Sequence, residues 1–263
     1  MPTRHIEFDH TRLAVHLTGK GPLALLVHGY PLDHRMWLDV MHGPLAQRRT
    51  LVAVDLRGHG SSPWCGDAEH PMHTFADDLA AVIRTLTDAP IDVVGLSMGG
   101  YVTEALWAQH PQLVRSLVLT NTRAAADTPL VRDGRQVAIQ DVVQNGRRKL
   151  AESMLQKLVL PRADTLLRAR IQSMIEGTAV ETIVADLRGL ADRPDRTALL
   201  PTITVPTLVV AGEHDPITPQ AEMQAMAQAI PKAEFVVVEG SAHMTPMEQP
   251  QAFADAVGAF WVD

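Results

Sequence analysis

The sequence is short of the residues that mark several classes of protein. Its 263 residues include one cysteine, so no internal disulfide can form, which favours a reducing compartment such as the cytoplasm. No apolar run approaches the roughly 18 residues that a membrane-spanning helix needs. The first ten residues are polar and lack the apolar core of a signal peptide. We therefore expect a globular cytoplasmic protein without a membrane segment.

Basic charge is also scarce. The chain has 23 lysines and arginines against 30 aspartates and glutamates, a formal net charge of −7. No basic stretch dominates, which argues against a nucleic-acid partner. The 12 histidines show no paired spacing typical of metal ligands. We therefore expect neither a metal nor a cofactor.

Apolar runs and segments with helical spacing alternate along most of the chain. The alternation indicates a mostly parallel sheet with helices on both faces, so the fold class is α/β. Eight segments have the length and composition of strands, namely residues 4–8, 13–17, 23–27, 50–54, 91–94, 114–120, 207–211 and 234–238.

The pattern changes between residues 123 and 200, where no strand is expected. Thr128 and Pro129 can start a helix, with proline at its first position. Thr178 and Glu181 have the spacing of a capping box ahead of another helix. This segment is predicted to form four short helices that cap the edge of the sheet. Residues 1–122 and 201–263 would then form the core.

One strand ends in the sequence Gly95-Leu96-Ser97-Met98-Gly99, and a helix-compatible segment follows it. Gly-x-Ser-x-Gly at a strand-to-helix turn is typical of a nucleophile elbow, whose strained serine lifts its hydroxyl above the sheet. Glycines are needed where the strand and the helix pass too closely for a Cβ atom. The helix directs free N–H groups toward a negative charge beside the serine. Ser97 is the predicted nucleophile.

A serine nucleophile needs a base, and that base needs an orienting acid. Asp215 and His243 each follow a predicted strand by a short loop, so they lie at the sheet edge where ligands bind. Their order, Ser97 before Asp215 before His243, is the order expected of α/β-hydrolases.

Other interpretations of these residues stay open. Asp215 precedes a proline and is also suited to cap the next helix. Glu213 and Asp127 are rivals of Asp215 for the role of the acid that orients His243, although Asp127 falls in the predicted cap. His243 is also compatible with a solvent-exposed position in its loop.

An oxyanion hole requires two backbone N–H groups. The residue after the nucleophile, Met98, supplies one of them. The other is expected from the loop after residues 23–27, and Tyr30 is the favoured donor. Pro31 has no N–H to donate, so it is excluded as the second oxyanion donor.

Five motifs together resemble the α/β-hydrolase superfamily, and within it the bacterial esterase, 3-oxoadipate enol-lactonase and cofactor-free haloperoxidase-like group. The resemblance runs from about Leu23 to Phe260 and implies the roles given above for Ser97, Asp215 and His243. It also implies that residues 55–62, including Arg57 and His59, form a structural loop. The motifs begin at His28 (His-Gly-Tyr-Pro), Asp55 (Asp-Leu-Arg-Gly-His-Gly-Ser-Ser), Gly95 (Gly-Leu-Ser-Met-Gly-Gly), Gly212 (Gly-Glu-His-Asp) and Gly240 (Gly-Ser-Ala-His).

The expected function is that of a serine esterase or lactonase, which cleaves a small-molecule carboxylic ester or lactone through an acyl-enzyme on Ser97. Enol-lactone hydrolysis, carbon–carbon bond hydrolysis and perhydrolysis use the same triad and remain alternatives. The non-enzymatic alternative is a ligand receptor that has the same fold but no catalytic activity. Serine at the elbow argues against haloalkane dehalogenases and epoxide hydrolases, which use aspartate there.

The predicted cap differs from the rest of the chain in charge and in aromatic content. Residues 123–200 carry a formal net charge of +3 and the remainder carries −10. All 11 aromatic residues lie outside this segment. If the basic residues of this segment face the active site, they would favour acidic substrates. If they lie on solvated helix faces, they would have no such effect. Without aromatics, the pocket wall is expected to be aliphatic and flexible.

Overall fold

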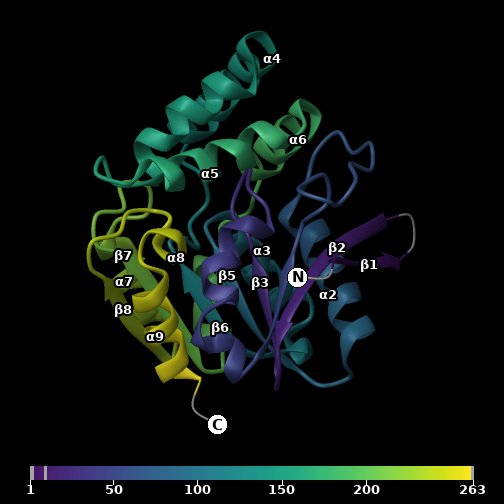
Figure 1. The fold of residues 1–263 in the computed structure, drawn as a ribbon, viewed down its shortest axis with the longest axis vertical. Coiled ribbons are helices and arrows are strands. Elements are labelled where there is room, and N and C mark those ends of the chain that lie inside the picture. Colours follow the sequence, from purple (N-terminus) through teal and green to yellow (C-terminus); the bar gives the residue numbers. More distant parts are fainter. Residues whose placement is uncertain (1–2, 9–10, 262–263) are drawn as a thin grey trace.

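The computed structural model describes residues 3–8 and 11–261, and an eight-stranded sheet forms its centre (Figure 1). The strand order is β1-β2-β4-β3-β5-β6-β7-β8, antiparallel where β2 meets β1 and β4 and parallel elsewhere. The predicted α/β class and its mostly parallel sheet are therefore confirmed. The strands are β1 Thr3–Phe8, β2 Thr11–Gly19, β3 Leu23–Val27, β4 Thr50–Val54, β5 Ile91–Leu96, β6 Val114–Thr120, β7 Thr207–Gly212 and β8 Ala233–Val238.

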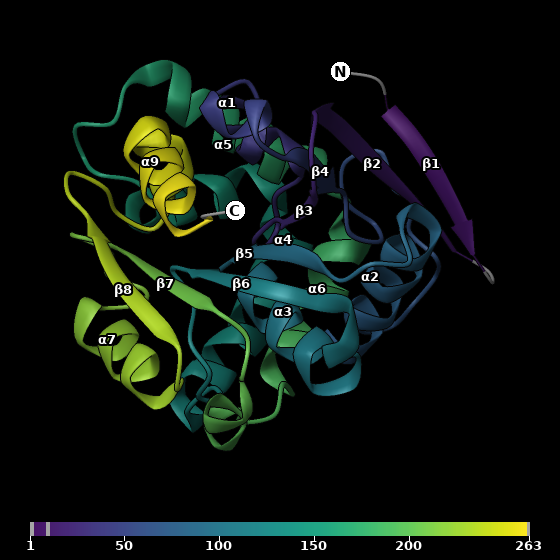
Figure 2. The ribbon, with the colours of Figure 1, turned by 90° about the horizontal axis from the view of Figure 1, so that it is seen from below.

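Helices cover both faces of the sheet, as the view from below in Figure 2 shows. Helices α2 (Met72–Leu86), α3 (Met98–Gln109) and α7 (Gln220–Ala229) lie on one face. Helices α1 (Leu38–Met41) and α9 (Pro250–Phe260) lie on the other. The remaining short elements are the helix α8 (Thr245–Glu248) and the 3₁₀ turns η1 (His34–Trp37), η2 (Pro44–Gln47) and η3 (Pro111–Leu113).

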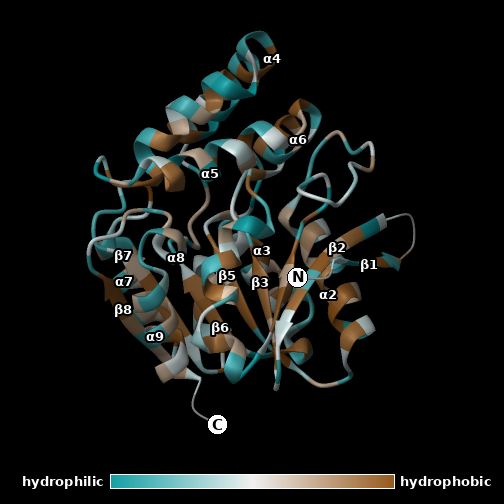
Figure 3. Ribbon diagram, viewed as in Figure 1, coloured by the Kyte–Doolittle hydropathy of each residue, from teal (hydrophilic) through white to brown (hydrophobic). Residues whose placement is uncertain are grey.

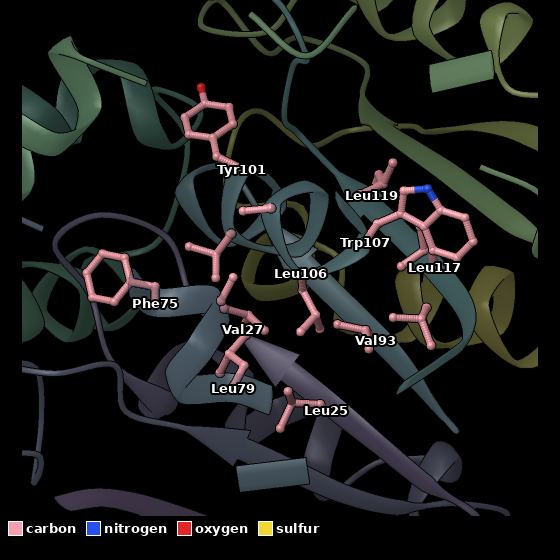
Figure 4. Close-up of a cluster of buried hydrophobic side chains, with 14 of the residues drawn as sticks. Leu25, Val27, Phe75, Leu79, Val93, Tyr101, Leu106, Trp107, Leu117 and Leu119 are labelled. Atoms are coloured by element: carbon pink, nitrogen blue, oxygen red, sulfur yellow. The ribbon is translucent and has the colours of Figure 1, made fainter. Parts of the chain in front are cut away.

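The apolar strands form two cores because successive side chains point to opposite faces of a sheet. In β3, Leu25 and Val27 pack with α2 and α3, whereas Leu26 packs on the opposite face. Figure 4 shows the first of these cores, in which Phe75 and Leu106 meet the strand side chains. Apart from β1, which is mostly hydrophilic, the strands are largely hydrophobic (Figure 3).

A helical insertion, residues 121–206, connects β6 to β7 and lies above the sheet (Figure 1). Its helix α4 loses helical backbone geometry at Gly146, where φ is 80°, so it consists of two segments. Thr128 caps the start of α4, as predicted. None of the helices in the described part of the chain is both long and apolar enough to cross a membrane. The insertion contains α4 (Pro129–Leu158), α5 (Thr165–Gly177), α6 (Val180–Ala191) and the 3₁₀ turn η4 (Thr197–Thr202).

The capping box predicted from Thr178 and Glu181 is wrong. Helix α6 begins after Ala179, which makes no side-chain capping bond. The Thr178 hydroxyl donates instead to the carbonyl oxygen of Pro31 at 3.0 Å. The threonine therefore attaches the insertion to the loop after β3, a long-range contact that local spacing cannot predict.

A buried ion pair joins the insertion to the loop after β4. The ring nitrogens of His59 lie 3.0 Å from the Arg57 carbonyl oxygen and 2.9 Å from an Asp186 carboxylate oxygen. Both acceptors require an N–H, so His59 carries a positive charge. Nδ1 of His70 lies 2.8 Å from the other Asp186 oxygen. All three side chains are fully buried.

Folding shifts both pKa values of this pair in the direction that stabilises it. Burial alone would lower the pKa of His59, but the charge and hydrogen bond of Asp186 more than offset this and raise it. Burial would raise the pKa of Asp186, yet the charge of His59 and the bonds from both histidines lower it. The His59 contribution to stability is therefore complete below the ordinary histidine pKa and disappears as the pH rises through the raised value. The Asp186 contribution is lost as the pH falls through its lowered value.

We therefore expect Asp186→Asn to reduce the free energy of unfolding by roughly 3–5 kcal/mol near pH 5.5, and by less near pH 9. Urea unfolding at both pH values measures the difference. The exposed pair of His110 and Asp77, 2.7 Å apart, provides the matched control. Asp77→Asn is expected to cost less than about 1 kcal/mol at either pH. Equal losses for the two variants at both pH values would contradict the role of the buried pair.

Candidate active site

Ser97 occupies a strained turn between β5 and α3. Its φ of +55° and ψ of −116° are unusual for a residue with a side chain. Among the described residues its hydroxyl has no hydrogen-bond partner, and the side chain lines a cavity beneath the insertion. The turn therefore presents the hydroxyl to that cavity, at the N-terminus of α3.

Two glycines make this turn possible. A Cβ atom on Gly95 would collide with the Gly99 carbonyl oxygen and with the side chain of Thr103. A Cβ atom on Gly99 would collide with the carbonyl oxygens of Val27 and His28. The close approach of β5, α3 and β3 thus excludes larger residues at both positions.

His243 and Asp215 form a buried hydrogen-bonded pair. Nδ1 of His243 lies 2.8 Å from Oδ2 of Asp215. Asp215 belongs to the loop after β7, and His243 belongs to the loop between β8 and α8. Only His243 reaches the cavity that Ser97 lines, because Asp215 lies behind it. The pairing leaves Nε2 of His243 without a partner among the described residues.

Asp215 is held by more groups than the sequence predicted. Nδ2 of Asn121 donates to its Oδ2 at 2.8 Å, and the Thr218 hydroxyl donates to the same oxygen. The backbone N–H of Ile217 donates to Oδ1 at 2.8 Å. Burial would raise the pKa of Asp215, but the charge and hydrogen bond of His243, followed by the Thr218 and Asn121 bonds, hold it well below its usual range. Asp215 is therefore an ionised acceptor that fixes the ring of His243.

Asn121 was not predicted as a site residue. It directly follows β6 with a φ of +44° and is fully buried. Its amide also donates to the Ala242 carbonyl oxygen at 3.2 Å, so one side chain holds both Asp215 and the residue before His243. A polar residue at the end of the strand beside β7 is the only signal that could have indicated this role.

We expect Asn121→Ala to lower kcat roughly 10- to 100-fold with little change in KM, because one or two bonds to a buried charge are lost. Steady-state hydrolysis of a short-chain ester at neutral pH measures both constants. The control is Asn145→Ala on α4, which removes a similar 2.6 Å amide–carboxylate bond to Asp141 at the surface. An Asn121→Ala enzyme with the kcat of the control variant would refute the positioning role.

The cavity has a volume of about 330 Å³ and lies between the insertion and the carboxyl ends of the strands. Both segments of α4 line it, together with the loop after β3 and the start of α3. It is lined by Tyr30, Ser97, Met98, Tyr101, Val131, Gly134, Arg135, Ala138, Leu150, Ser153, Met154, Lys157, Leu158, Leu187, Leu190, Ile217 and His243.

The two predicted oxyanion donors also border this cavity. Met98 is the first residue of α3, so its N–H has no partner within the helix. Within the described part of the chain, no acceptor is found for the N–H groups of Met98 and Tyr30. The Tyr30 hydroxyl is buried and likewise has no partner there. The two amides are therefore available to an anion beside Ser97.

The rival residues are engaged in other contacts, and neither Glu213 nor Asp127 lines the cavity. Glu213 accepts from the N–H of Gly240 at 2.8 Å, and Asp127 binds Arg135 and Arg193. Arg57 pairs with Asp78 at 2.7 Å. Asp215 does not cap α7, whose N-cap is Pro219.

One histidine cluster was missed because its members are distant in sequence. The rings of His16 and His34 stack with centroids 3.4 Å apart, and both bind Asp55, at 3.1 and 2.8 Å. Their potential ligand atoms lie within 4.8 Å of one another. One ring nitrogen of each histidine is already engaged by the carboxylate, which also accepts from the N–H of Ser61 at 2.9 Å. The cluster therefore stabilises the loop after β4.

Comparison with known proteins extends these observations. A pimeloyl-[acyl-carrier protein] methyl ester esterase of Neisseria meningitidis is 33% identical over 236 residues, which cover 87% of this chain and 88% of the relative. The structure of a thermophilic esterase from Thermogutta terrifontis, with malate bound, has a TM-score of 0.93 and 35% identity. That match covers 99% of this chain and 98% of the other.

A second solved structure points the same way. The enol-lactonase from Burkholderia xenovorans LB400 has a TM-score of 0.91 at 25% identity and covers 99% of this chain and 100% of its own. The family model described as the alpha/beta hydrolase fold matches residues 22–250. The predicted resemblance is thus confirmed, and the chain belongs to the α/β-hydrolase family.

Proposed function

We propose that the protein is a serine hydrolase that cleaves carboxylic esters or lactones through an acyl-enzyme on Ser97. The observation that carries the proposal is the convergence of Ser97 and the Asp215-bound His243 on one cavity. The esterase and enol-lactonase among its relatives support an acyl substrate. No step of the proposed reaction calls for a metal or a cofactor.

In the first half of the reaction, Nε2 of His243 takes the proton of the Ser97 hydroxyl, and the serine oxygen attacks the carbonyl carbon. The resulting oxyanion accepts hydrogen bonds from the N–H groups of Met98 and Tyr30, assisted by the N-terminus of α3. Asp215 stabilises the imidazolium that forms. His243 then protonates the departing alkoxide, which leaves the acyl group on Ser97.

In the second half, His243 removes a proton from water, and the hydroxide attacks the acyl carbon. The oxyanion forms again in the same place, and its collapse releases the carboxylic acid. His243 returns the proton to Ser97. Peroxide in place of water would give perhydrolysis, so that alternative shares every residue of this scheme.

Two further features belong to the proposal. Residues 123–200 would act as a cap that shapes the cavity over a core made of residues 1–122 and 201–263. The partner would be a small-molecule ester or lactone, and the compartment would be the cytoplasm, which suits the single free cysteine, Cys65.

The test is the early time course of p-nitrophenol release from p-nitrophenyl butyrate. We expect a burst that approaches one equivalent per active site, followed by slower turnover as the acyl-enzyme hydrolyses. A parallel panel of lactones and carbon–carbon substrates ranks the alternatives. Absence of turnover on every member, with no labelling by a serine-directed probe, would favour the silent receptor.

A further inference from the structure

The charged side chains around the cavity are all of one sign. Among its 17 lining residues, Arg135 and Lys157 are cationic, and none is a carboxylate. This is unexpected in a chain with a formal net charge of −7. Although residues 123–200 carry 13 basic residues, only these two border the cavity. The excess positive charge therefore faces the substrate at two defined positions.

Both cations belong to α4, on either side of its break at Gly146. Arg135 lies in the first segment of the helix and Lys157 in the last turn of the second. Because the backbone leaves the helical conformation between them, both segments can line the same cavity. A straight helix over this length would direct its two ends about 30 Å apart.

Arg135 is fixed in place and still has free donors. Its Nε donates to Asp127, which also accepts from Arg193 at 3.0 Å. The guanidinium of Arg193 in turn lies 4.1 Å from the ring centre of Tyr101, another lining residue. Among the described residues, the terminal amino groups of Arg135 have no acceptor. Two arginines against one aspartate leave a net positive charge beside the cavity.

Lys157 has no carboxylate partner within the described ranges. A useful comparison is Lys149 on the same helix, whose ammonium lies 2.7 Å from a carboxylate oxygen of Asp141. The charge of Lys149 is thus neutralised away from the cavity, whereas that of Lys157 is not. Lys157 is exposed, so its ammonium can reach an anion without a large desolvation cost.

The wall beside the cations is aliphatic. Leu150, Met154, Leu187 and Leu190 contribute to it, and the insertion has no aromatic residue to form a flat slot. Such a wall fits a flexible hydrocarbon chain and adapts to its length. The free N–H donors of Arg135 still need an acceptor, and an anionic group on the substrate would supply one.

We infer that the natural substrate carries a carboxylate on its acyl portion, which Arg135 and Lys157 bind while Ser97 attacks the ester or lactone carbonyl. The inference rests on the proposed function and names its substrate class: half-esters of dicarboxylic acids, or lactones that bear a free carboxylate. The free carboxylate does not react. It fixes the register of the acyl chain in the cavity.

The experiment compares monomethyl esters of straight-chain dicarboxylic acids, from succinate to suberate, with the corresponding neutral dimethyl esters. In the wild-type protein, kcat/KM for at least one monoester is expected to exceed that of its diester roughly 10-fold or more. Arg135→Met is expected to remove most of that ratio through KM, and Lys157→Met part of it. Lys149→Met, the matched control, keeps the wild-type ratio. Added salt lowers the ratio, because the attraction is electrostatic.

A wild-type ratio near one for every chain length would overturn the inference while leaving the ester hydrolase intact. A ratio that Arg135→Met and Lys157→Met leave unchanged would overturn it equally. A binding measurement separates this question from catalysis. Monomethyl adipate, but not the neutral methyl hexanoate, is expected to raise the Tm of the Ser97→Ala protein, and Arg135→Met in that background should abolish the effect. Equal shifts with both esters would refute carboxylate recognition even if no ester were turned over.

Discussion

Replacing Ser97 with alanine is expected to lower kcat for p-nitrophenyl butyrate roughly 10⁴- to 10⁶-fold, to the level that binding and the oxyanion donors alone support. The alanine keeps the Cβ atom and removes only the nucleophilic oxygen. Stability should change little, because the hydroxyl has no hydrogen-bond partner among the described residues. Steady-state kinetics and thermal unfolding of the same preparations measure both effects.

Two companion variants make this result specific. Ser153→Ala removes the other serine hydroxyl that lines the cavity and is expected to retain most of the turnover. His243→Ala combined with Ser97→Ala should be scarcely slower than Ser97→Ala alone, because the two residues act as one unit. A Ser97→Ala protein that keeps a tenth of the wild-type kcat would exclude the acyl-enzyme on this serine.

Asp215→Asn is expected to lower kcat roughly 10³- to 10⁴-fold with a smaller effect on KM. The isosteric amide keeps the shape of the side chain but removes the charge that stabilises the imidazolium of His243. It also allows the amide to donate to Nδ1, which would place the histidine proton on Nε2, the nitrogen that must accept from Ser97. Kinetics across a pH series, with circular dichroism to verify folding, measure the effect.

Glu213→Gln is the matched control for this substitution. Glu213 lies two residues away, and its bond to the N–H of Gly240 can be kept by the amide oxygen of glutamine. We expect kcat to remain near the wild-type value. A large loss in Glu213→Gln together with a small loss in Asp215→Asn would transfer the role of the acid to Glu213.

The fold was predictable because its signal is local. Short apolar runs such as residues 23–27 and 207–211 correspond to β3 and β7 within a residue. The loops that follow buried parallel strands meet at one edge, so Ser97 and the later Asp215 and His243 could be placed together before any contact was known.

Contacts between distant polar residues were not predictable in this way. Asn121 has no motif, and its function depends on the neighbouring strand that brings Asp215 within 2.8 Å. Thr178 matched a capping pattern, yet the Pro31 carbonyl competes successfully for its hydroxyl. Asp186 has no sequence feature that connects it to His59. Hydrophobic periodicity determines which elements form, but not which buried acceptor a polar side chain will meet.

The positions of the basic residues in the insertion were likewise not predictable from the sequence. Composition indicated a basic segment but could not separate solvated helix faces from cavity-lining residues. The break of α4 at Gly146 decides this, because it brings Arg135 and Lys157 to one cavity and leaves Lys149 outside it. Glycine in a helical segment was visible in the sequence, whereas the direction of the resulting bend was not.

The most direct test of Ser97 as the nucleophile is the site of covalent labelling by an alkyl fluorophosphonate, read by intact mass and by peptide mapping. We predict one adduct per chain, on Ser97, with labelling abolished in Ser97→Ala and slowed strongly in His243→Ala and Asp215→Asn. Ser153→Ala should be labelled like the wild type. An adduct on Ser153, or a fully active protein that takes up no label, would contradict Ser97 as the nucleophile.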